Sequence, residues 1–124
     1  MKIGGIIINS NNILELVVKA ADSKRAEDIV ALDVAEVSLL ADYFVVCHGN
    51  SDKQVMAIAS EIITAAQKSQ IEVKRVEGKE SARWVLIDLG DVIVHVFHNE
   101  EREFYNLEKL WSDAPLVNIT SMVD

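Results

Sequence analysis

Two alternating segments joined by the dipeptide Gly90-Asp91 constrain this chain more than any other feature. Trp84 to Leu89 precedes the dipeptide and Val92 to Phe97 follows it, and both segments are rich in β-branched and aromatic residues. Such segments around a two-residue loop that contains glycine predict a β-hairpin. Because side chains alternate between the two faces of a strand, this loop also predicts which residues share a face.

The predicted register gives the hairpin one uniform face and one mixed face. The uniform face is aliphatic throughout, as in a core: Leu89 opposite Val92, Ile87 opposite Val94 and Val85 opposite Val96. The mixed face has Trp84 opposite Phe97, Leu86 opposite His95 and Asp88 opposite Ile93. Large aromatic side chains beside ionisable groups are typical of protein-binding surfaces. An alternative stays open here, in which a helix covers the mixed face and His95 is a hydrogen-bonded core histidine.

Helical and strand-like patterns alternate along the rest of the chain. Helices are predicted over residues 12–24, from Ser51 to about 66, and over 102–111, with strands over 28–34, 43–47 and 71–76. This order predicts an α/β fold, a single domain with a mixed sheet of about five strands flanked by helices. We expect an extension over residues 1–11, the folded domain over 12–113 and a loose C-terminal tail over 114–124.

Capping patterns predict where two of the helices begin. Asn12 with Glu15 is a candidate capping pair for the first helix, and Ser51 with Gln54 for the second. The second helix also has an apolar stripe at helical spacing, made of Val55, Ile58, Ala59, Ile62 and Ala66. In the last helix, the spacing of Phe104, Leu107 and Trp111 predicts an inward face, with Tyr105, Glu108 and Lys109 on its flank.

Composition limits the classes of partner. The formal net charge of −8 disfavours extensive contact with nucleic acid. It suits a basic protein partner, but on charge alone the favoured interpretation is that acidity keeps the protein soluble. The single cysteine, Cys47, fits a reducing compartment, and no apolar run reaches the length of a bilayer span. We therefore expect a cytoplasmic protein with little direct contact to nucleic acid or membrane.

The sequence gives little support for a metal site or for a nucleophilic cysteine. The candidate ligands are Cys47, His48, His95 and His98, but adjacent residues of a strand point to opposite faces. The sequence contains no Cys-x-x-Cys pair and no His-Glu-x-x-His motif. We expect no metal site, and we interpret Cys47 as a small buried hydrophobic residue.

Nucleotidyl transfer is the stronger enzyme hypothesis. Gly49-Asn50-Ser51 follows a predicted strand and opens a helix, where backbone N–H groups can hold a phosphate. Two-metal phosphoryl transfer also needs converging carboxylates, and the chain offers only Asp88 on a strand and Asp91 in the following loop. Without such a pair, the glycine-containing turn is better explained as a helix cap.

Four separated motifs resemble one known family. They are the strand-like segment 28–34, the segment 42–51 with Gly49-Asn50-Ser51, the hairpin region 82–97, and the segment Tyr105 to Trp111. In content and order they are similar to the Iojap-like family of ribosomal silencing factors (RsfS), over about residues 13–115. The resemblance implies a fold related to nucleotidyltransferases that lacks the catalytic acids, with no enzymatic activity and no cofactor.

The resemblance also implies a function and a site. Family members bind ribosomal protein L-fourteen on the large ribosomal subunit, block joining of the small subunit and so repress translation when nutrients are scarce; they are often homodimers when free. The partner-binding residues that it implies lie within the matching motifs: Trp84, His95, Phe97, Tyr105, Glu108, Lys109 and Trp111. A ribosome-assembly adaptor without anti-association activity is the first alternative, and a nucleotidyltransferase is the second.

Overall fold

A computed structural model of the chain describes residues 2–3, 6–7, 9–105 and 114–123. Its helices are α1 (Ser10–Ser23), α2 (Asp52–Lys68) and α3 (Asn99–Tyr105), with a short 3-10 helix, η1, over Thr120–Met122. The strands of the main sheet are β3 (Glu27–Asp33), β4 (Tyr43–Gly49), β5 (Arg75–Glu77), β6 (Trp84–Asp88) and β7 (Val92–His98). Near the N-terminus, β1 (Lys2–Ile3) and β2 (Ile6–Ile7) form a separate two-stranded sheet.

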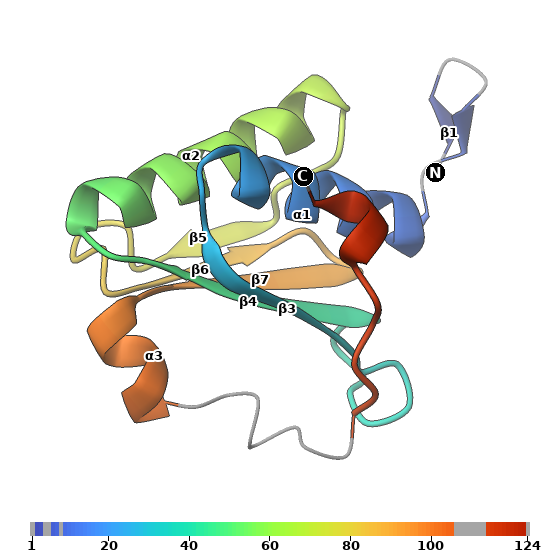
Figure 1. Cartoon of the computed structure of the whole chain (residues 1–124). Coiled ribbons are helices and arrows are strands. Elements are labelled where there is room, and N and C mark those ends of the chain that lie inside the picture. Colours follow the sequence, from blue (N-terminus) through green and yellow to red (C-terminus); the bar gives the residue numbers. More distant parts are fainter. Residues whose placement is uncertain (1, 4–5, 8, 106–113, 124) are drawn as a thin grey trace.

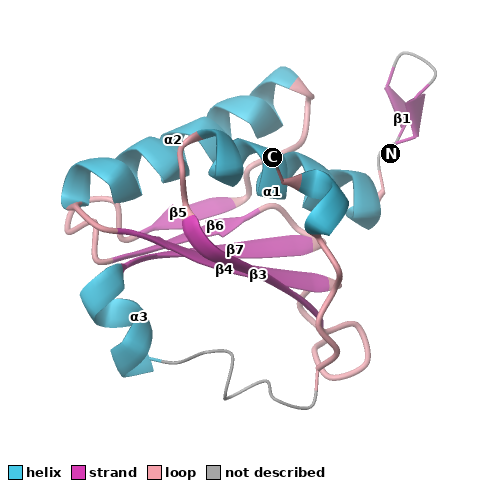
Figure 2. Cartoon of the chain, in the orientation of Figure 1, coloured by secondary structure: helices cyan, strands magenta, loops and turns pink. Residues whose placement is uncertain are grey.

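The main sheet has five strands in the order β3-β4-β7-β6-β5. Only β4 and β7 run parallel, and the other neighbouring pairs are antiparallel, so the sheet is mixed. Helices α1 and α2 lie together on one face, while α3 lies on the opposite side of the sheet (Figure 1). Figure 2 shows the same layers by type of secondary structure. The predicted α/β domain with a mixed sheet flanked by helices is confirmed.

The core lies between the sheet and the pair of helices α1 and α2. The predicted apolar stripe of α2 is confirmed, because the same five residues are its buried ones. They pack against the aliphatic face of the hairpin, where Val85, Ile87, Val94 and Val96 have no solvent exposure. Each such side chain contributes roughly 1.5–3 kcal/mol when it is removed from water.

The hairpin has the predicted register. Trp84 pairs with Phe97, and Asp88 pairs with Ile93 at the other end of the two strands. Gly90 has a φ of +89°, a region that residues with a Cβ rarely adopt. The carboxylate of Asp88 accepts a hydrogen bond from the Gly90 N–H at 2.8 Å and stabilises this turn. Glycine in the loop therefore specifies the geometry that sorts the two faces.

The first helix begins differently from the prediction. Its capping box joins Asn9 and Asn12: the Asn9 side chain accepts from the Asn12 N–H at 2.9 Å, and the Asn12 side chain accepts from the Asn9 N–H at 3.4 Å. Glu15 instead forms an ion pair with Lys19, 2.9 Å away and one turn along. The predicted Asn12–Glu15 pair is therefore wrong, and the helix starts inside the expected extension.

At α2 the predicted cap is confirmed in part. The Ser51 hydroxyl accepts from the Gln54 N–H at 3.1 Å. The Gln54 side chain, however, accepts from the N–H of Asn50 at 2.8 Å, and its amide donates to the carbonyl of Arg25 at 2.9 Å. Gln54 thus joins the start of α2 to the loop that precedes β3.

Two predicted boundaries need correction. The strand predicted over residues 71–76 is shorter and lies later, because regular pairing with β6 is confined to Arg75–Glu77. The last helix begins at Asn99, three residues before the predicted start at Arg102. Its predicted continuation beyond Tyr105 lies outside the described residues.

The prediction of a loose C-terminal tail is wrong for residues 114–123. This segment runs along the outer edge of β3: the Asp33 N–H donates to the Pro115 carbonyl and the Val117 N–H to the Ala31 carbonyl, both at 2.9 Å. Ile119 and other apolar residues of the segment pack against the main core. The segment is ordered because β3 is an edge strand, whose outer backbone groups would otherwise have no partner in the sheet. The C-terminal segment supplies hydrogen bonds to these groups, and its alternating apolar residues face the core.

Candidate partner-binding surface

The candidate surface is the sheet face opposite α1 and α2, called the mixed face below. Directly paired residues of neighbouring strands point to the same side of a sheet. Its members therefore follow from the pairing: Trp84, Leu86 and Asp88 on β6, Ile93, His95 and Phe97 on β7, Phe44, Val46 and His48 on β4, Val30 and Leu32 on β3, and Arg75 and Glu77 on β5. The structure brings together the three predicted site residues of the hairpin on this face.

Aromatic rings form the centre of the mixed face. Trp84 stacks on Phe97 with ring centroids 5.0 Å apart and an interplanar angle of 28°. His95 lies 5.9 Å from the Trp84 ring and contacts Phe44 edge-on at 5.4 Å. Phe97 is fully buried and His95 is only 6% exposed, whereas Trp84 is half-buried. Of the three, Trp84 is the residue that presents an accessible surface.

A hydrogen bond between Trp84 and His95 determines the tautomer of the imidazole. The indole Nε1–H of Trp84 donates to Nδ1 of His95 at 3.1 Å. Since Nδ1 accepts, the proton of the neutral ring is on Nε2, which is buried and has no hydrogen-bond partner. Burial lowers the pKa of His95 to about 4, so the ring is neutral at physiological pH.

These contacts decide between the two interpretations of His95. The histidine is buried and hydrogen-bonded, and α3 contacts β7 and β4, so a helix covers part of this face. The alternative of a core histidine is therefore confirmed for His95. It does not extend to Trp84, whose half-exposed ring lies at the β6 end of the cluster.

A glycine allows the turn before β6 to approach the backbone of Trp84 closely. Gly78 has a φ of +89°, and a Cβ built there would lie 2.0 Å from the Trp84 carbonyl oxygen. No other residue fits so close to that strand. Glu77, Gly78, Trp84 and Leu86 line a shallow hollow next to the indole. The turn before β6 therefore sets both the position of Trp84 and the open space beside it.

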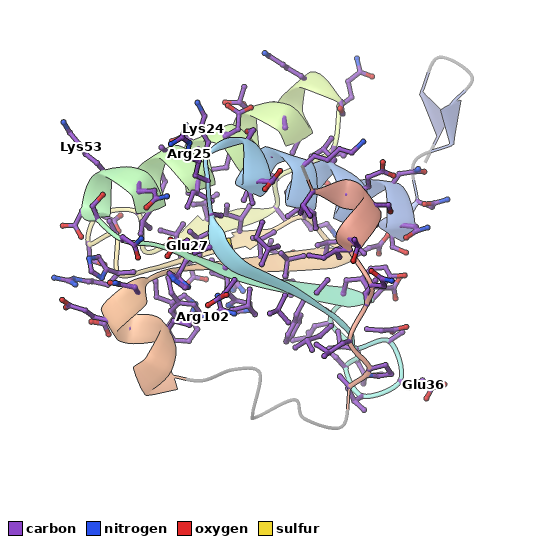
Figure 3. All side chains as sticks on the ribbon, in the orientation of Figure 1. Lys24, Arg25, Glu27, Glu36, Lys53 and Arg102 are labelled. Atoms are coloured by element: carbon purple, nitrogen blue, oxygen red, sulfur yellow. The ribbon has the colours of Figure 1, made fainter. Side chains whose placement is uncertain are left out.

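Helix α3 is anchored to the sheet by a polar network that sequence reasoning missed. Nη1 of Arg102 donates to the Asp28 carbonyl at 2.6 Å and to Nδ1 of His48 at 3.0 Å. Because a guanidinium only donates, His48 carries its proton on Nε2 and donates it to Glu27 at 3.2 Å. Arg102 and Glu27 lie close together between α3 and the sheet (Figure 3). Contacts between residues more than 70 positions apart leave no local signal in the sequence.

The remaining predicted site residues fall within the helix predicted over residues 102–111. Tyr105 is the last residue of α3. Glu108, Lys109 and Trp111 lie outside the described residues, as do the predicted inward residues Leu107 and Trp111. Their roles stay predictions.

The candidate metal ligands do not converge. Cys47 is buried in the main core, and burial raises the pKa of its thiol to about 12, with Arg102 acting in the opposite sense. His48 contacts Glu27, whereas Nδ1 of His98 accepts from the Glu100 N–H at 3.3 Å. The described part of the chain contains no group of three His, Cys, Asp or Glu side chains that could hold a metal ion.

The residues of the nucleotidyl-transfer hypothesis have structural roles in the described structure. Ser51 caps α2, and a Cβ at Gly49 would lie 3.1 Å from the Val55 nitrogen, so the strand approaches the helix closely there. The Asp88 carboxylate stabilises the hairpin turn. The backbone carbonyl of Asp91 accepts from the Asp42 N–H at 2.8 Å.

Among the described helices, none is long and apolar enough to span a membrane.

Fold and surface together define a class: a small α/β domain with an aromatic cluster on one face of its mixed sheet. The model of the family described as "Ribosomal silencing factor during starvation" matches residues 7–124. The chain is 61% identical to ribosomal silencing factor RsfS of Bacillus subtilis over 112 residues, covering 90% of this chain and 95% of that protein. This chain belongs to the RsfS family of ribosomal silencing factors.

A solved structure and a more distant relative agree with this assignment. A crystal structure of a protein from Bacillus halodurans is 58% identical and superimposes with a TM-score of 0.79, covering 87% of this chain and 98% of that one. The mouse protein named "Mitochondrial assembly of ribosomal large subunit protein 1" is 30% identical over 103 residues, covering 80% of this chain and 45% of that protein. The fold is thus shared with a bacterial protein of known structure, and the sequence similarity extends to the mouse protein.

Proposed function

We propose that this protein binds the large ribosomal subunit through ribosomal protein L-fourteen and sterically blocks joining of the small subunit. The effect is repression of translation when nutrients are scarce, in the bacterial cytoplasm. The family description names ribosomal silencing during starvation, and the name of the mouse relative refers to the large subunit. The choice of L-fourteen as the partner rests on the family resemblance of the hairpin and of the segment after it.

The observation that most supports this proposal is that neighbouring side chains fix the orientation of the Trp84 ring. Its ring is half-exposed, stacks on the buried Phe97 and is oriented by the hydrogen bond to His95. A rigid aromatic side chain loses little conformational entropy when it is buried by a partner. Tryptophan is also among the residues that most often dominate the energy of protein interfaces.

The burial pattern supports different proposed roles for the predicted residues. Trp84 contacts the partner directly, with Leu86 beside it across the hollow. His95 and Phe97 support the indole from behind, because their side chains are buried. Tyr105, Glu108, Lys109 and Trp111 stay proposed partner contacts on the strength of the family resemblance.

No catalytic step is part of the proposed mechanism. Binding covers a surface that the small subunit needs, and exclusion follows from overlap alone. The net charge of −8 favours encounter with a basic ribosomal protein and makes association weaker at higher salt. The free protein is proposed to be a homodimer, without a cofactor.

Substituting Trp84 tests the proposed surface. Trp84→Ala is expected to weaken binding to purified large subunits by more than about 1 kcal/mol, because the anchor is lost. The measurement is co-sedimentation of the labelled protein with large subunits over a range of concentrations. Leu16→Ala is the matched control, since Leu16 is also half-buried and apolar but lies on α1, on the other side of the sheet.

The folded state of both variants is checked by their denaturant midpoints. An unchanged affinity for Trp84→Ala with an intact fold would remove Trp84 from the surface. A loss of equal size in Leu16→Ala would show that the effect is not specific to the mixed face.

A second candidate function is that of a ribosome-assembly adaptor. The name of the mouse relative, which refers to assembly of the ribosomal large subunit, favours it. Such an adaptor would use the same aromatic surface, so binding alone does not separate the two functions. An adaptor binds the large subunit and leaves subunit joining unchanged, whereas a silencing factor lowers it.

A further inference from the structure

A second surface stands out at the loop between β3 and β4. Four large aliphatic side chains are highly exposed in the described part of the chain: Val37 at 48%, Leu39 at 105%, Leu40 at 77% and Leu116 at 73%. Three belong to this loop, and the fourth belongs to the C-terminal segment. We call these four residues the leucine patch.

The loop that carries the patch is held by hydrogen bonds. The Val34 N–H donates to the Asp42 carbonyl at 2.9 Å and closes the base of the loop. The N–H groups of Val37 and Ser38 both donate to the Val34 carbonyl, at 3.0 and 2.8 Å. The Leu40 N–H donates to the Ser38 hydroxyl at 3.1 Å. The apolar side chains are therefore presented by an ordered turn.

The C-terminal segment brings Leu116 to the same place. Leu116 forms a bridge with Leu32, next to the hydrogen bond from Asp33 to Pro115. Ala114 is buried in one small cluster with Val34, at the base of the loop. Figure 1 shows the loop beside this segment, at one end of the molecule. Residues from two distant parts of the sequence thus form one exposed apolar surface.

The surroundings of the patch are acidic. Residues 33–42 contain three carboxylates and no lysine or arginine: Asp33, Glu36 and Asp42. Asp91 adds another near the base of the loop, where its carbonyl accepts from the Asp42 N–H. Figure 3 shows Glu36 on the loop, at the opposite end of the molecule from Lys24, Arg25 and Lys53. A basic surface is the electrostatic complement of this end.

The patch is distinct from the surface around Trp84. Along the hairpin, Trp84 pairs with Phe97 at one end, and Asp88 pairs with Ile93 at the other. The loop adjoins this second end through the bond between Asp42 and Asp91. At about 3.3 Å per residue, the length of β6 alone places the two surfaces more than about 10 Å apart.

The charge pattern discriminates among possible occupants. Phosphate backbones and anionic lipid surfaces are repelled by the carboxylates around the patch. A symmetric contact with a second copy would oppose the same carboxylates to each other, which is also unfavourable. A protein with an apolar pocket rimmed by lysine or arginine satisfies both the leucines and the acidic rim.

We propose that the leucine patch is a second docking surface, which inserts Leu39 and Leu40 into an apolar pocket of a basic protein. It acts in addition to the surface around Trp84 and does not depend on it. On a ribosomal particle the two surfaces would hold the domain at two points and restrict its rotation. Such a two-point attachment increases the residence time without a larger single interface.

Photo-crosslinking in cells identifies what touches the patch. The full chain carries benzoyl-phenylalanine in place of Leu39, and crosslinked products are identified by mass spectrometry. The control carries the same group in place of Glu72, an exposed residue outside the loop. The proposal expects one predominant basic protein from position 39, which the control position does not capture.

The affinity of the purified crosslinked protein then tests the chemistry. Leu39→Ser with Leu40→Ser is expected to weaken its binding at least tenfold, and the fold is kept because both side chains are exposed. Glu36→Lys is expected to weaken binding and to reduce its salt dependence. Glu61→Lys, the same charge change on α2 at a partly exposed side chain, is expected to have little effect.

Three results would overturn the proposal. They are the absence of any protein product from position 39, capture of a second copy of this chain or of nucleic acid, and an unchanged affinity of the serine variant. Failure of the proposed function is a different observation, namely that the wild-type protein does not sediment with large subunits. The crosslink at position 39 decides the present proposal in either case.

Discussion

The indole of Trp84 and the imidazole of His95 depend on each other through one hydrogen bond. The indole N–H requires an unprotonated Nδ1, and burial keeps the imidazole neutral. Protonation of His95 would place two donors against each other in a buried site. Orientation of the proposed anchor is therefore coupled to the charge of the residue behind it.

This coupling predicts how stability changes with pH. His95 has a folded-state pKa of about 4, below its ordinary value of 6.5, so the unfolded chain binds more protons between these values. Its contribution to stability is complete above pH 6.5 and is lost as the pH falls toward 4. Between pH 7 and pH 5 the expected loss is about 2 kcal/mol.

Denaturant unfolding at several pH values measures this loss. His95→Asn keeps an acceptor near the position of Nδ1 but does not titrate, so its stability is expected to change less over the same range. The difference between the two proteins isolates His95 from the other histidines and from the carboxylates. Parallel pH curves would contradict the assigned burial and tautomer of His95.

The faces of single residues could be predicted from the sequence, but their exposure could not. The Gly90-Asp91 loop alone predicts that Trp84, His95 and Phe97 share a face. Full burial of Phe97 depends on its neighbours on β4 and β6, and strand order in a sheet leaves no local sequence signal. The same holds for the leucine patch, whose exposure results from the absence of a covering element in the described structure.

At the level of elements, α3 shows how little of a helix's position is local. Arg102 joins it to the ends of β3 and β4 through two backbone carbonyls and His48. The Arg102 side chain therefore attaches α3 to the ends of two strands that are distant from it in the sequence.

Removal of this side chain is expected to loosen α3. Arg102→Ala leaves the Asp28 carbonyl and His48 without their donor, and the expected loss of stability is about 1–2 kcal/mol. Hydrogen exchange of the α3 amides is expected to accelerate more than that of the α2 amides. The measurement is hydrogen exchange followed by mass spectrometry, together with denaturant unfolding.

Arg83→Ala is the matched control for this variant. Arg83 also reaches α3, where it pairs with Glu100 at 3.3 Å, but both side chains are largely exposed. Exposed ion pairs contribute little, so a loss below about 1 kcal/mol is expected. Equal effects of the two arginine variants would contradict the special role of Arg102.

Elements with strong periodicity were predictable, and elements specified by long-range contacts were not. The α2 stripe and both hairpin strands follow from spacing alone. The C-terminal segment has no such signal, because it is ordered by the unpaired edge of β3. The start of α3 was placed three residues late because Asn99 to Glu101 have no apolar residue to mark a helix.

For the whole molecule, shape and charge support a blocking mechanism. A standard interface covers about 800 Å² of each partner, roughly a ninth of the 7129 Å² surface of this chain. Most of the domain would therefore protrude from the partner, which is what the proposed blocking mechanism requires. The family could be predicted from the four motifs in the sequence. The roles of site residues 108, 109 and 111 stay predictions, because these residues lie outside the described structure.

Subunit joining on a sucrose gradient tests the central claim most directly. Purified subunits are mixed at a Mg²⁺ concentration that promotes joining, with and without this protein. We predict that the protein sediments with the large subunit and lowers the joined-particle peak, and that Trp84→Ala does both less well. Co-sedimentation without any change in joining would contradict the silencing mechanism and favour the assembly adaptor, and a protein that stays at the top of the gradient would contradict ribosome binding itself.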